Sequence, residues 1–212
     1  TEQSDLMQSL WGRSGESPVV VLAASSPSDC FHYAYMASKI AIERMTPVIL
    51  LTDGFLGNGS EPWKIPSMAD MPPITKRMAV SQETYKPYRR PDNTLAREWA
   101  IPGMEGFEHR IGGLEKDENG AVSHVPENHQ LMCELRAEKV ARCVDFVPNL
   151  ETKGCTEGDV LIVGWGGTFG HLVSATRDLN LLGKKVGLAH FNYINPLPAN
   201  TADVFSKYKK IV

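Results

Sequence analysis

The stretch from Pro18 to Pro66 places the strongest constraint on the fold of this 212-residue chain. Two short runs rich in β-branched residues, Val19–Ala24 and Val48–Leu51, have the length and composition of buried strands. Between them, apolar residues recur every three or four positions from Phe31 to Met45, which predicts a helix. Strand, helix and strand in this order form a βαβ unit. Such a unit predicts a parallel sheet that is covered on both faces.

Polar residues at the two ends of this unit are candidates for capping or for ligand contacts. The segment Ser26–Asp29 precedes the helix and is expected to cap its first free N–H groups with side-chain oxygens. Asp53 follows the second strand, and ligands bind beyond the carboxyl ends of parallel strands in open α/β sheets. Asp53 is therefore a candidate ligand contact, with capping of the next turn as the alternative. The glycines of residues 55–60 predict a loop.

A second βαβ unit is predicted near the end of the chain. Its strands are Asp159–Val163 and Lys185–Phe191, and a glycine-rich turn, Gly164–Gly170, opens the helix between them. Backbone N–H groups at such a turn can hold a phosphate. The spacing is GxGxxxG, however, and no acidic residue ends the next strand, so a tight turn is favoured over a dinucleotide site.

The segment between the two units is rich in proline and glycine, yet it carries scattered aromatic residues. We expect residues 61–125 to form an ordered excursion that packs over a surface, with a tight turn at Asp117–Gly120. Arg110 lies in a glycine-flanked loop, where it can meet an anionic ligand or a partner carboxylate. A long amphipathic helix is predicted near residues 126–147. Its charged residues are expected to form a solvated face: Glu134, Arg136, Glu138, Lys139 and Arg142.

Composition excludes several classes of protein. A net charge of −3 gives no basic field for nucleic acid or an anionic membrane. The apolar runs are far shorter than the roughly 20 residues that span a bilayer, and no secretory signal is present. The four cysteines and the His124/His129 pair lack the spacing of metal ligands. The sequence therefore predicts a cytoplasmic protein with inert thiols and no metal ligands in this chain.

Motifs along the whole chain resemble the α subunit of 2-oxoacid:ferredoxin oxidoreductases, most closely the bacterial 2-oxoglutarate type. The resemblance runs in order along the sequence and is most specific through residues 1–135. The motifs that carry it are TEQSDLMQSLWGRSGESP, AASSPSDCF, MTPVILLTDGFLGNGSEPWKIP, WAIPG, GFEHRIGGLEKDENG and PENHQLM.

The resemblance implies an α/β fold with two parallel-sheet domains, joined by the irregular excursion and the long helix. Residues 1–66 correspond to the C-terminal part of a pyrimidine-binding (PYR-like) thiamine diphosphate domain. Residues 67–155 form the connecting segment, and residues 156–212 begin a Rossmann-type domain similar to the C-terminal domain of transketolase. The last residues, 209–212, have the pattern of a strand just beginning, so we expect a fragment of a longer subunit.

The resemblance also implies a reaction. In this family thiamine diphosphate attacks the 2-oxo carbon, CO₂ leaves, coenzyme A takes the acyl group, and electrons pass through iron–sulfur clusters to ferredoxin. The diphosphate–Mg²⁺ site and the clusters belong to other domains or to the β subunit of a hetero-oligomer. The activating glutamate and the substrate loop lie upstream of residue 1. We therefore assign no catalytic residue here, expect the fragment alone to be inactive and cofactor-free, and leave 2-oxoglutarate, pyruvate and branched-chain 2-oxoacids open.

Seven residues are predicted to line the site of the complete enzyme or its interface. Gln3, Asp5, Asp53 and Asn58 are the candidates on the cofactor side. Arg110, Gly166 and Gly167 are the candidates for substrate or interface contacts. Two alternatives stand beside this prediction: a nucleotide-binding Rossmann-like enzyme and a non-catalytic assembly module.

Overall fold

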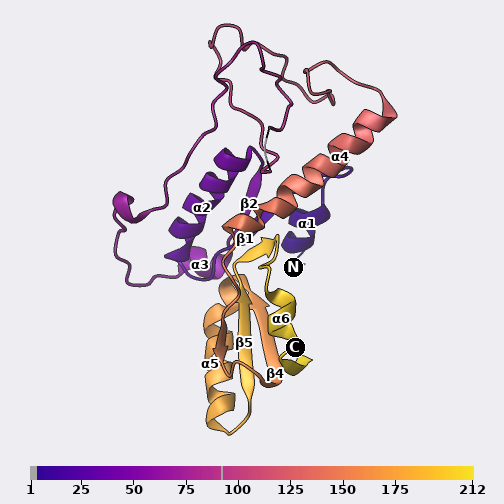
Figure 1. Cartoon of the computed structure of the whole chain (residues 1–212). Coiled ribbons are helices and arrows are strands. Elements are labelled where there is room, and N and C mark those ends of the chain that lie inside the picture. Colours follow the sequence, from indigo (N-terminus) through magenta and orange to yellow (C-terminus); the bar gives the residue numbers. More distant parts are fainter. Residues whose placement is uncertain (1–3, 92) are drawn as a thin grey trace.

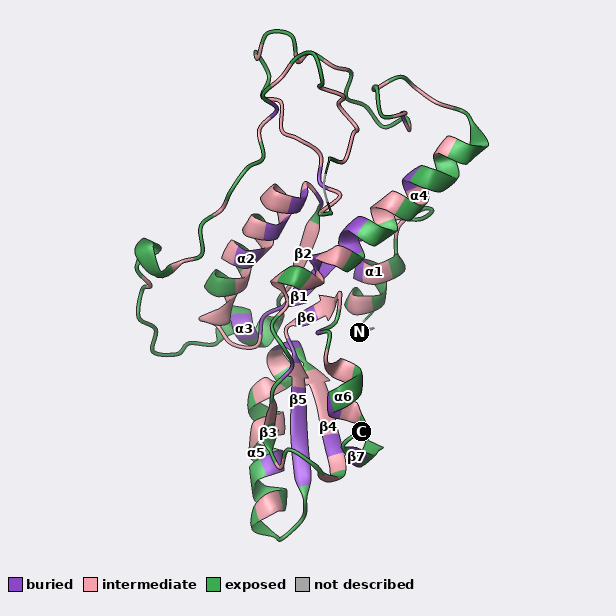
Figure 2. Ribbon diagram, viewed as in Figure 1, coloured by how far each residue is buried: buried purple, intermediate pink, exposed green. Residues whose placement is uncertain are grey.

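The computed structural model describes residues 4–91 and 93–212 as two α/β units joined end to end, with an extended arm at the far end of the first (Figure 1). The first unit holds a three-stranded sheet in the order β2–β1–β6. The second holds a four-stranded sheet in the order β3–β5–β4–β7. The arm, residues 71–125, is mostly exposed or half-buried, whereas β5 is almost wholly buried (Figure 2).

The first unit confirms the predicted βαβ arrangement. After α1 (Asp5–Trp11) the chain forms β1 (Val20–Ala23), α2 (Asp29–Arg44) and β2 (Val48–Leu51). The two strands pair in parallel, with Val20 opposite Val48. Apolar side chains drive this packing because β1 is buried along its full length. The core joins residues far apart in sequence: Val20, Leu22, Ile40, Val140, Cys143 and Tyr193.

The third strand of this sheet comes from the C-terminal part of the chain. Strand β6 (Tyr193–Asn195) pairs antiparallel with β1. The Asn192 side chain donates to the Ala23 carbonyl at 2.9 Å, while the Asn192 carbonyl accepts from the Ala23 N–H at 2.8 Å. The two units are thus tied by backbone pairing. The domain limits at residues 66 and 156 stay a prediction.

The second unit confirms the other predicted βαβ motif. Strand β4 (Gly158–Trp165) leads through η3 (Gly166–Thr168) into α5 (Phe169–Leu181), and β5 (Val186–Phe191) pairs in parallel with β4. Strand β3 (Thr152–Gly154) runs antiparallel to β5 at one edge. At the other edge, after α6 (Thr201–Phe205), β7 (Tyr208–Ile211) pairs in parallel with β4, as the end of the sequence predicts.

The long helix and the arm are present, with one change in geometry. Helix α4 (Pro126–Ala141) follows the arm, and its continuation tightens into the 3₁₀-helix η2 (Arg142–Phe146). The predicted turn at Asp117–Gly120 is confirmed, because the Asp117 N–H donates to Ala121 and Gly120 has a φ of +86°. A third 3₁₀ segment, η1 (Met68–Asp70), precedes the arm. The arm reaches the first unit through Trp99, whose Nε1 donates to the Ile42 carbonyl at 3.0 Å.

One local prediction is wrong and another is confirmed only in part. Residues 55–60 are not simply a loop, because the short helix α3 (Gly54–Asn58) takes up most of them. At the front of α2, Ser26 Oγ accepts from the Asp29 N–H at 3.4 Å as predicted, but Ser28 makes no side-chain cap. Its N–H donates instead to the carboxylate of Glu61 at 2.6 Å, a residue 33 positions away that capping patterns do not include.

The prediction that Lys139 lies on the solvated face of the long helix is also wrong, since its side chain is buried. Its Nζ donates to the Met45 carbonyl at 2.9 Å, at the residue that ends α2. Burial lowers the pKa of Lys139 to about 8, and Arg90 and Arg97 on the arm add to the shift. Tertiary packing of α4 against the end of α2, with the arm arginines nearby, is the physical reason for the error.

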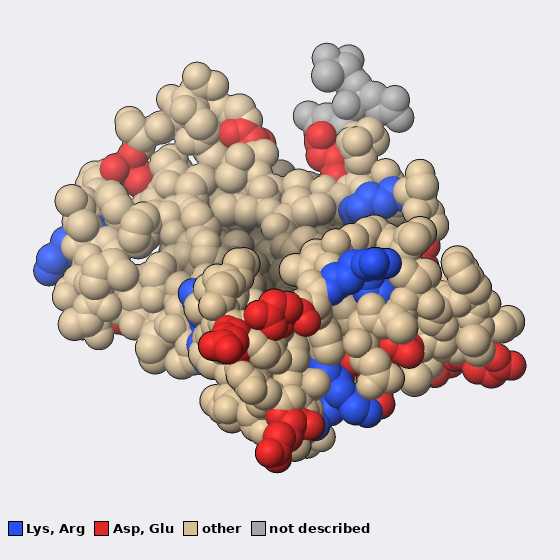
Figure 3. All heavy atoms as spheres, turned by 90° about the horizontal axis from the view of Figure 1, so that it is seen from above, with Lys and Arg blue, Asp and Glu red and all other residues tan. Residues whose placement is uncertain are grey.

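Seen from above, acidic and basic residues are interspersed over the visible face rather than gathered into a field of one sign (Figure 3). No helix among the described residues is both long and apolar enough to span a bilayer.

Candidate functional site

Four of the predicted residues come together at the junction of the two units. Asp5, Asp53, Gly166 and Gly167 line a cavity of about 330 Å³, which we call the junction cavity. The carboxyl ends of β2 and β4 both open into it. The remaining lining residues come from both units: Leu6, Ala24, Leu51, Thr52, Trp165 and Thr168. The juxtaposition of two strand ends matches the place where α/β proteins bind ligands.

Asp53 acts as the N-cap of α3. Its Oδ1 accepts from the Leu56 N–H at 2.9 Å, which satisfies one free donor of the first helical turn. The predicted capping role is therefore confirmed. The other carboxylate oxygen points toward Gly167, so a single side chain caps one unit and contacts the other.

In the glycine turn after β4, Gly166 and Gly167 are each required to be glycine for a different reason. Gly166 has a φ of +62°, a conformation that side chains other than glycine rarely adopt. At Gly167 a Cβ would collide with the Asp53 carboxylate. The same carboxylate would repel a phosphate at this turn, so the geometry disfavours nucleotide binding here.

An imidazole that sequence reasoning did not single out as a site residue supports this turn. His190 is the next-to-last residue of β5, pairs with Gly164 and packs edge-on against Phe169, with ring centroids 4.9 Å apart. Both ring nitrogens are buried and meet no hydrogen-bond partner among the described residues. Burial lowers the pKa of His190 to about 4, opposed by the nearby backbone of Gly166 and by Asp29, so the ring is neutral at pH 7. No pattern in the sequence marks this burial.

The other predicted residues lie elsewhere. Asn58 is exposed, and its side chain donates to the Gly54 carbonyl within α3 at 2.7 Å. Arg110 is exposed on the arm and does not line the junction cavity. Gln3 lies outside the described residues. Within the part of the chain that the structure describes, no three His, Cys, Asp or Glu side chains lie together as metal ligands.

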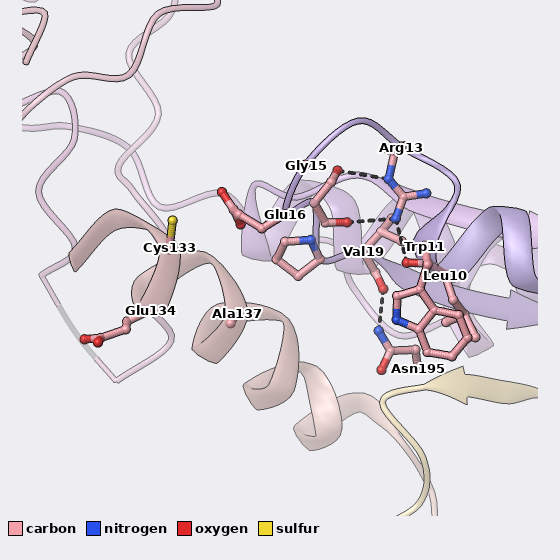
Figure 4. Close-up of a pocket in the computed structure, with 12 residues that line it drawn as sticks. Leu10, Trp11, Arg13, Gly15, Glu16, Val19, Cys133, Glu134, Ala137 and Asn195 are labelled. Atoms are coloured by element: carbon pink, nitrogen blue, oxygen red, sulfur yellow. Dashed lines mark hydrogen bonds between the residues drawn. The ribbon is translucent and has the colours of Figure 1, made fainter. Parts of the chain in front are cut away.

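Two further cavities flank the first sheet. One, of about 540 Å³, lies between α1, the following loop, α4 and Asn195 (Figure 4). Its one arginine, Arg13, is occupied by Ser9, Leu10 and Ser17. The other, of about 520 Å³, lies between the units and is lined in part by Asp29 and His190.

The comparisons with known proteins agree with this fold. Residues 1–128 match the protein family described as "Pyruvate flavodoxin/ferredoxin oxidoreductase, thiamine diP-bdg". The chain belongs to this family. A relative from Mycobacterium tuberculosis, "2-oxoglutarate oxidoreductase subunit KorA", is 49% identical over 214 residues, covering 100% of this chain and 32% of the relative. A "2-oxoglutarate synthase subunit KorA" from Methanothermobacter thermautotrophicus is 26% identical, covering 92% of this chain and 52% of the relative.

A solved structure of the same kind shares the fold along nearly the whole chain. It is described as "2-oxoglutarate:ferredoxin oxidoreductase from Magnetococcus marinus with 2-oxoglutarate, coenzyme A and succinyl-CoA bound". The TM-score is 0.91 at 33% identity, over 99% of this chain and 37% of the other. The chain thus spans about a third to a half of the length of these relatives.

Proposed function

We propose that this chain is part of the α subunit of a thiamine diphosphate-dependent 2-oxoglutarate:ferredoxin oxidoreductase. The overall reaction converts 2-oxoglutarate, coenzyme A and two oxidised ferredoxins into succinyl-CoA, CO₂, two reduced ferredoxins and one proton. One observation carries the proposal: the agreement with the Magnetococcus marinus enzyme in fold, at a TM-score of 0.91, extends over 99% of this chain.

The partners and cofactors of the complete enzyme form part of the same proposal. Thiamine diphosphate, when bound, supplies the carbon nucleophile that attacks the 2-oxo group, and the protein orients the reactants. The described residues offer no group of metal ligands, so the proposal places Mg²⁺ and the iron–sulfur clusters in other parts of the enzyme. A β subunit and ferredoxin complete a cytoplasmic hetero-oligomer.

In this proposal the chain contributes one wall of the site, at the junction cavity. Asp5 and Asp53 bring carboxylate acceptors to that wall, and Gly166 and Gly167 bring backbone close to it. Such groups can accept hydrogen bonds from a cofactor or from a partner subunit. Asn58 is exposed beside this wall on α3, and Arg110 remains a candidate for contact with a partner.

The first test uses the full-length protein that contains this chain, purified without oxygen together with its partner subunit. We expect coenzyme A-dependent reduction of a viologen dye with 2-oxoglutarate and at least tenfold less with pyruvate. Absence of turnover with every 2-oxoacid, when thiamine diphosphate and partner are both bound, would contradict the proposal.

A matched pair of variants tests the role of Asp53. Asparagine is a good N-cap, so Asp53→Asn keeps the cap and removes the charge, whereas Asp53→Ala removes both. If the carboxylate contacts the cofactor site, both variants lose at least tenfold in kcat/KM. Wild-type kinetics in Asp53→Asn, with a stability loss only in Asp53→Ala, would limit Asp53 to capping.

A further inference from the structure

Lys139 is a buried amine that forms no ion pair with a described carboxylate. Its residue is 9% exposed, and its Nζ donates to the carbonyl of Met45 at 2.9 Å. A single carbonyl is a weak partner for an ammonium group, because burying a charge is unfavourable unless it is well paired. The charged form of this amine is therefore more stable in any conformation in which water reaches it.

The arm contacts α4 on both sides of Lys139 and brings two arginines near its amine, so it is the element whose opening would expose the amine. Arg90 of the arm contacts the sulfur of Met132 on α4 at 3.8 Å. Further along, the guanidinium of Arg142 donates to the Asn93 carbonyl at 2.7 Å. Lys139 lies between Met132 and Arg142 on the helix. Arg90 and Asn93 therefore contact α4 and its η2 continuation on either side of Lys139.

The charges that face Lys139 add to the penalty. The arm presents Arg90 and Arg97, and α4 itself presents Arg136. From η2 comes the thiol of Cys143, and α2 offers the Met45 carbonyl. The largest contributions to the shifted pKa of Lys139 come from burial, the arginines and this thiol, and no described carboxylate is among them. The two carboxylates near Arg136 are paired with Arg136 itself: Glu115 of the arm at 2.9 Å, and Glu16.

We propose that the arm is a lid on α4 whose closure is opposed by the positive charge of Lys139, so that release of the Lys139 proton stabilises the closed state. This device does not depend on the proposed reaction. Glu115 anchors the arm to Arg136 and His129, and it is ionised throughout the neutral and alkaline range. In this pH range, Lys139 is then the group whose titration changes the equilibrium between the open and closed arm.

The direction follows from proton linkage. The pKa of Lys139 falls from its ordinary value of 10.5 to about 8 in the closed state, because burial and the two arm arginines disfavour the charge. The closed state thus binds fewer protons than the open state between these two values. Closure is weakest below pH 8, where the amine is charged in both states. It strengthens by up to about tenfold per pH unit between pH 8 and 10.5.

Hydrogen exchange of the arm in the full-length complex measures this opening. Residues 84–100 are followed from pH 7 to 10 in the wild type and in Lys139→Met and Lys139→Arg. Comparing proteins at the same pH cancels the chemistry of exchange itself. We expect Lys139→Met to exchange more slowly than the wild type at pH 7, with the difference shrinking more than tenfold by pH 10. Lys139→Arg keeps its charge, so its excess exchange persists at pH 10.

A second readout labels the amine directly. Trace acetic anhydride acylates Lys139 only when the arm opens, and the exposed Lys153 serves as the internal reference. Lys139→Gln replaces Lys139→Met if the methionine variant does not fold. A constant ratio of exchange between Lys139→Met and the wild type from pH 7 to 10 would overturn the proposal. Opening that increases with pH would overturn it as well, because a carboxylate would then be stabilising the ammonium.

Discussion

Replacing Gly167 by alanine tests the contact that joins the two units at the junction cavity. A Cβ at this position collides with Oδ2 and Cγ of Asp53 and comes within 3.1 Å of Oδ1, so the carboxylate must rotate or shift. Moving it strains the cap on Leu56, whose loss costs about 1 kcal/mol. Overpacking elsewhere in protein interiors costs typically about 1–3 kcal/mol. Because an aspartate side chain can partly rotate, we expect Gly167→Ala to destabilise the protein by about 1–2 kcal/mol.

Gly170, three residues later, provides the matched control. It is exposed in the first turn of α5 and has open space where a Cβ would stand. Gly170→Ala should therefore be neutral or stabilising by up to about 1 kcal/mol. Urea unfolding of the full-length protein is followed through Trp fluorescence, since Trp165 lies in the same turn. The expected result for Gly167→Ala is a lower midpoint with an unchanged slope.

A double variant identifies the atom responsible for this loss. Asp53→Ser keeps a capping oxygen but removes the outer carboxylate atoms that Gly167 meets. In that background Gly167→Ala should cost less than about 0.5 kcal/mol, giving a coupling energy of about 1 kcal/mol. An equal loss in both backgrounds, or a loss no larger than that of Gly170→Ala, would refute the reasoning.

Two further predictions concern the second unit. The neutral ring of His190 makes stability depend on pH: the pKa is about 4 in the folded protein, so the unfolded chain binds the extra proton as pH falls below about 6.5. We expect stability to fall by up to about 1.4 kcal/mol per pH unit from pH 6.5 to 4, and urea unfolding of His190→Asn to show a shallower dependence. A dependence identical to that of the wild type would contradict this. Asn200 accepts from the buried Leu150 N–H at 2.8 Å and donates to its carbonyl at 3.0 Å. Asn200→Ala should lose about 2 kcal/mol or more, whereas Asn58→Ala, at an exposed site, should stay within about 0.5 kcal/mol. Similar midpoints for the two asparagine variants would refute the assignment.

Local patterns predicted most of the regular structure. Both βαβ units follow from runs of β-branched residues and a helical period, since burial on both faces leaves a clear mark on such strands. The short helix α3 escaped prediction because its first turn depends on one cap, Asp53, within a glycine-rich segment. Glu61 escaped as the partner of Ser28 because the two are 33 positions apart.

The candidate site is only partly predictable: Asp53, Gly166 and Gly167 follow from their strand ends, whereas the burial of a polar side chain does not, as Lys139 outside the site also shows. A helical wheel places this lysine with its charged neighbours on α4, but it cannot include the arm that later covers that face. The same limit applies to His190, whose low pKa arises from burial under a turn of its own unit. Burial by distant segments has no local signature in the sequence.

The sequence by itself determined the two βαβ units, the turn residues that need glycine, and the family, because these depend on short-range periodicity, backbone sterics and ordered motifs. Only the tertiary structure decided that β6 returns to the first sheet, that Asp53 meets Gly167, and that Lys139 is buried against the end of α2. Each of these contacts joins segments separated by about a hundred residues or more of sequence, or depends on a surface that one element presents to another. Such pairings are selected by the total burial and hydrogen bonding of the folded chain, which no single stretch of residues contains.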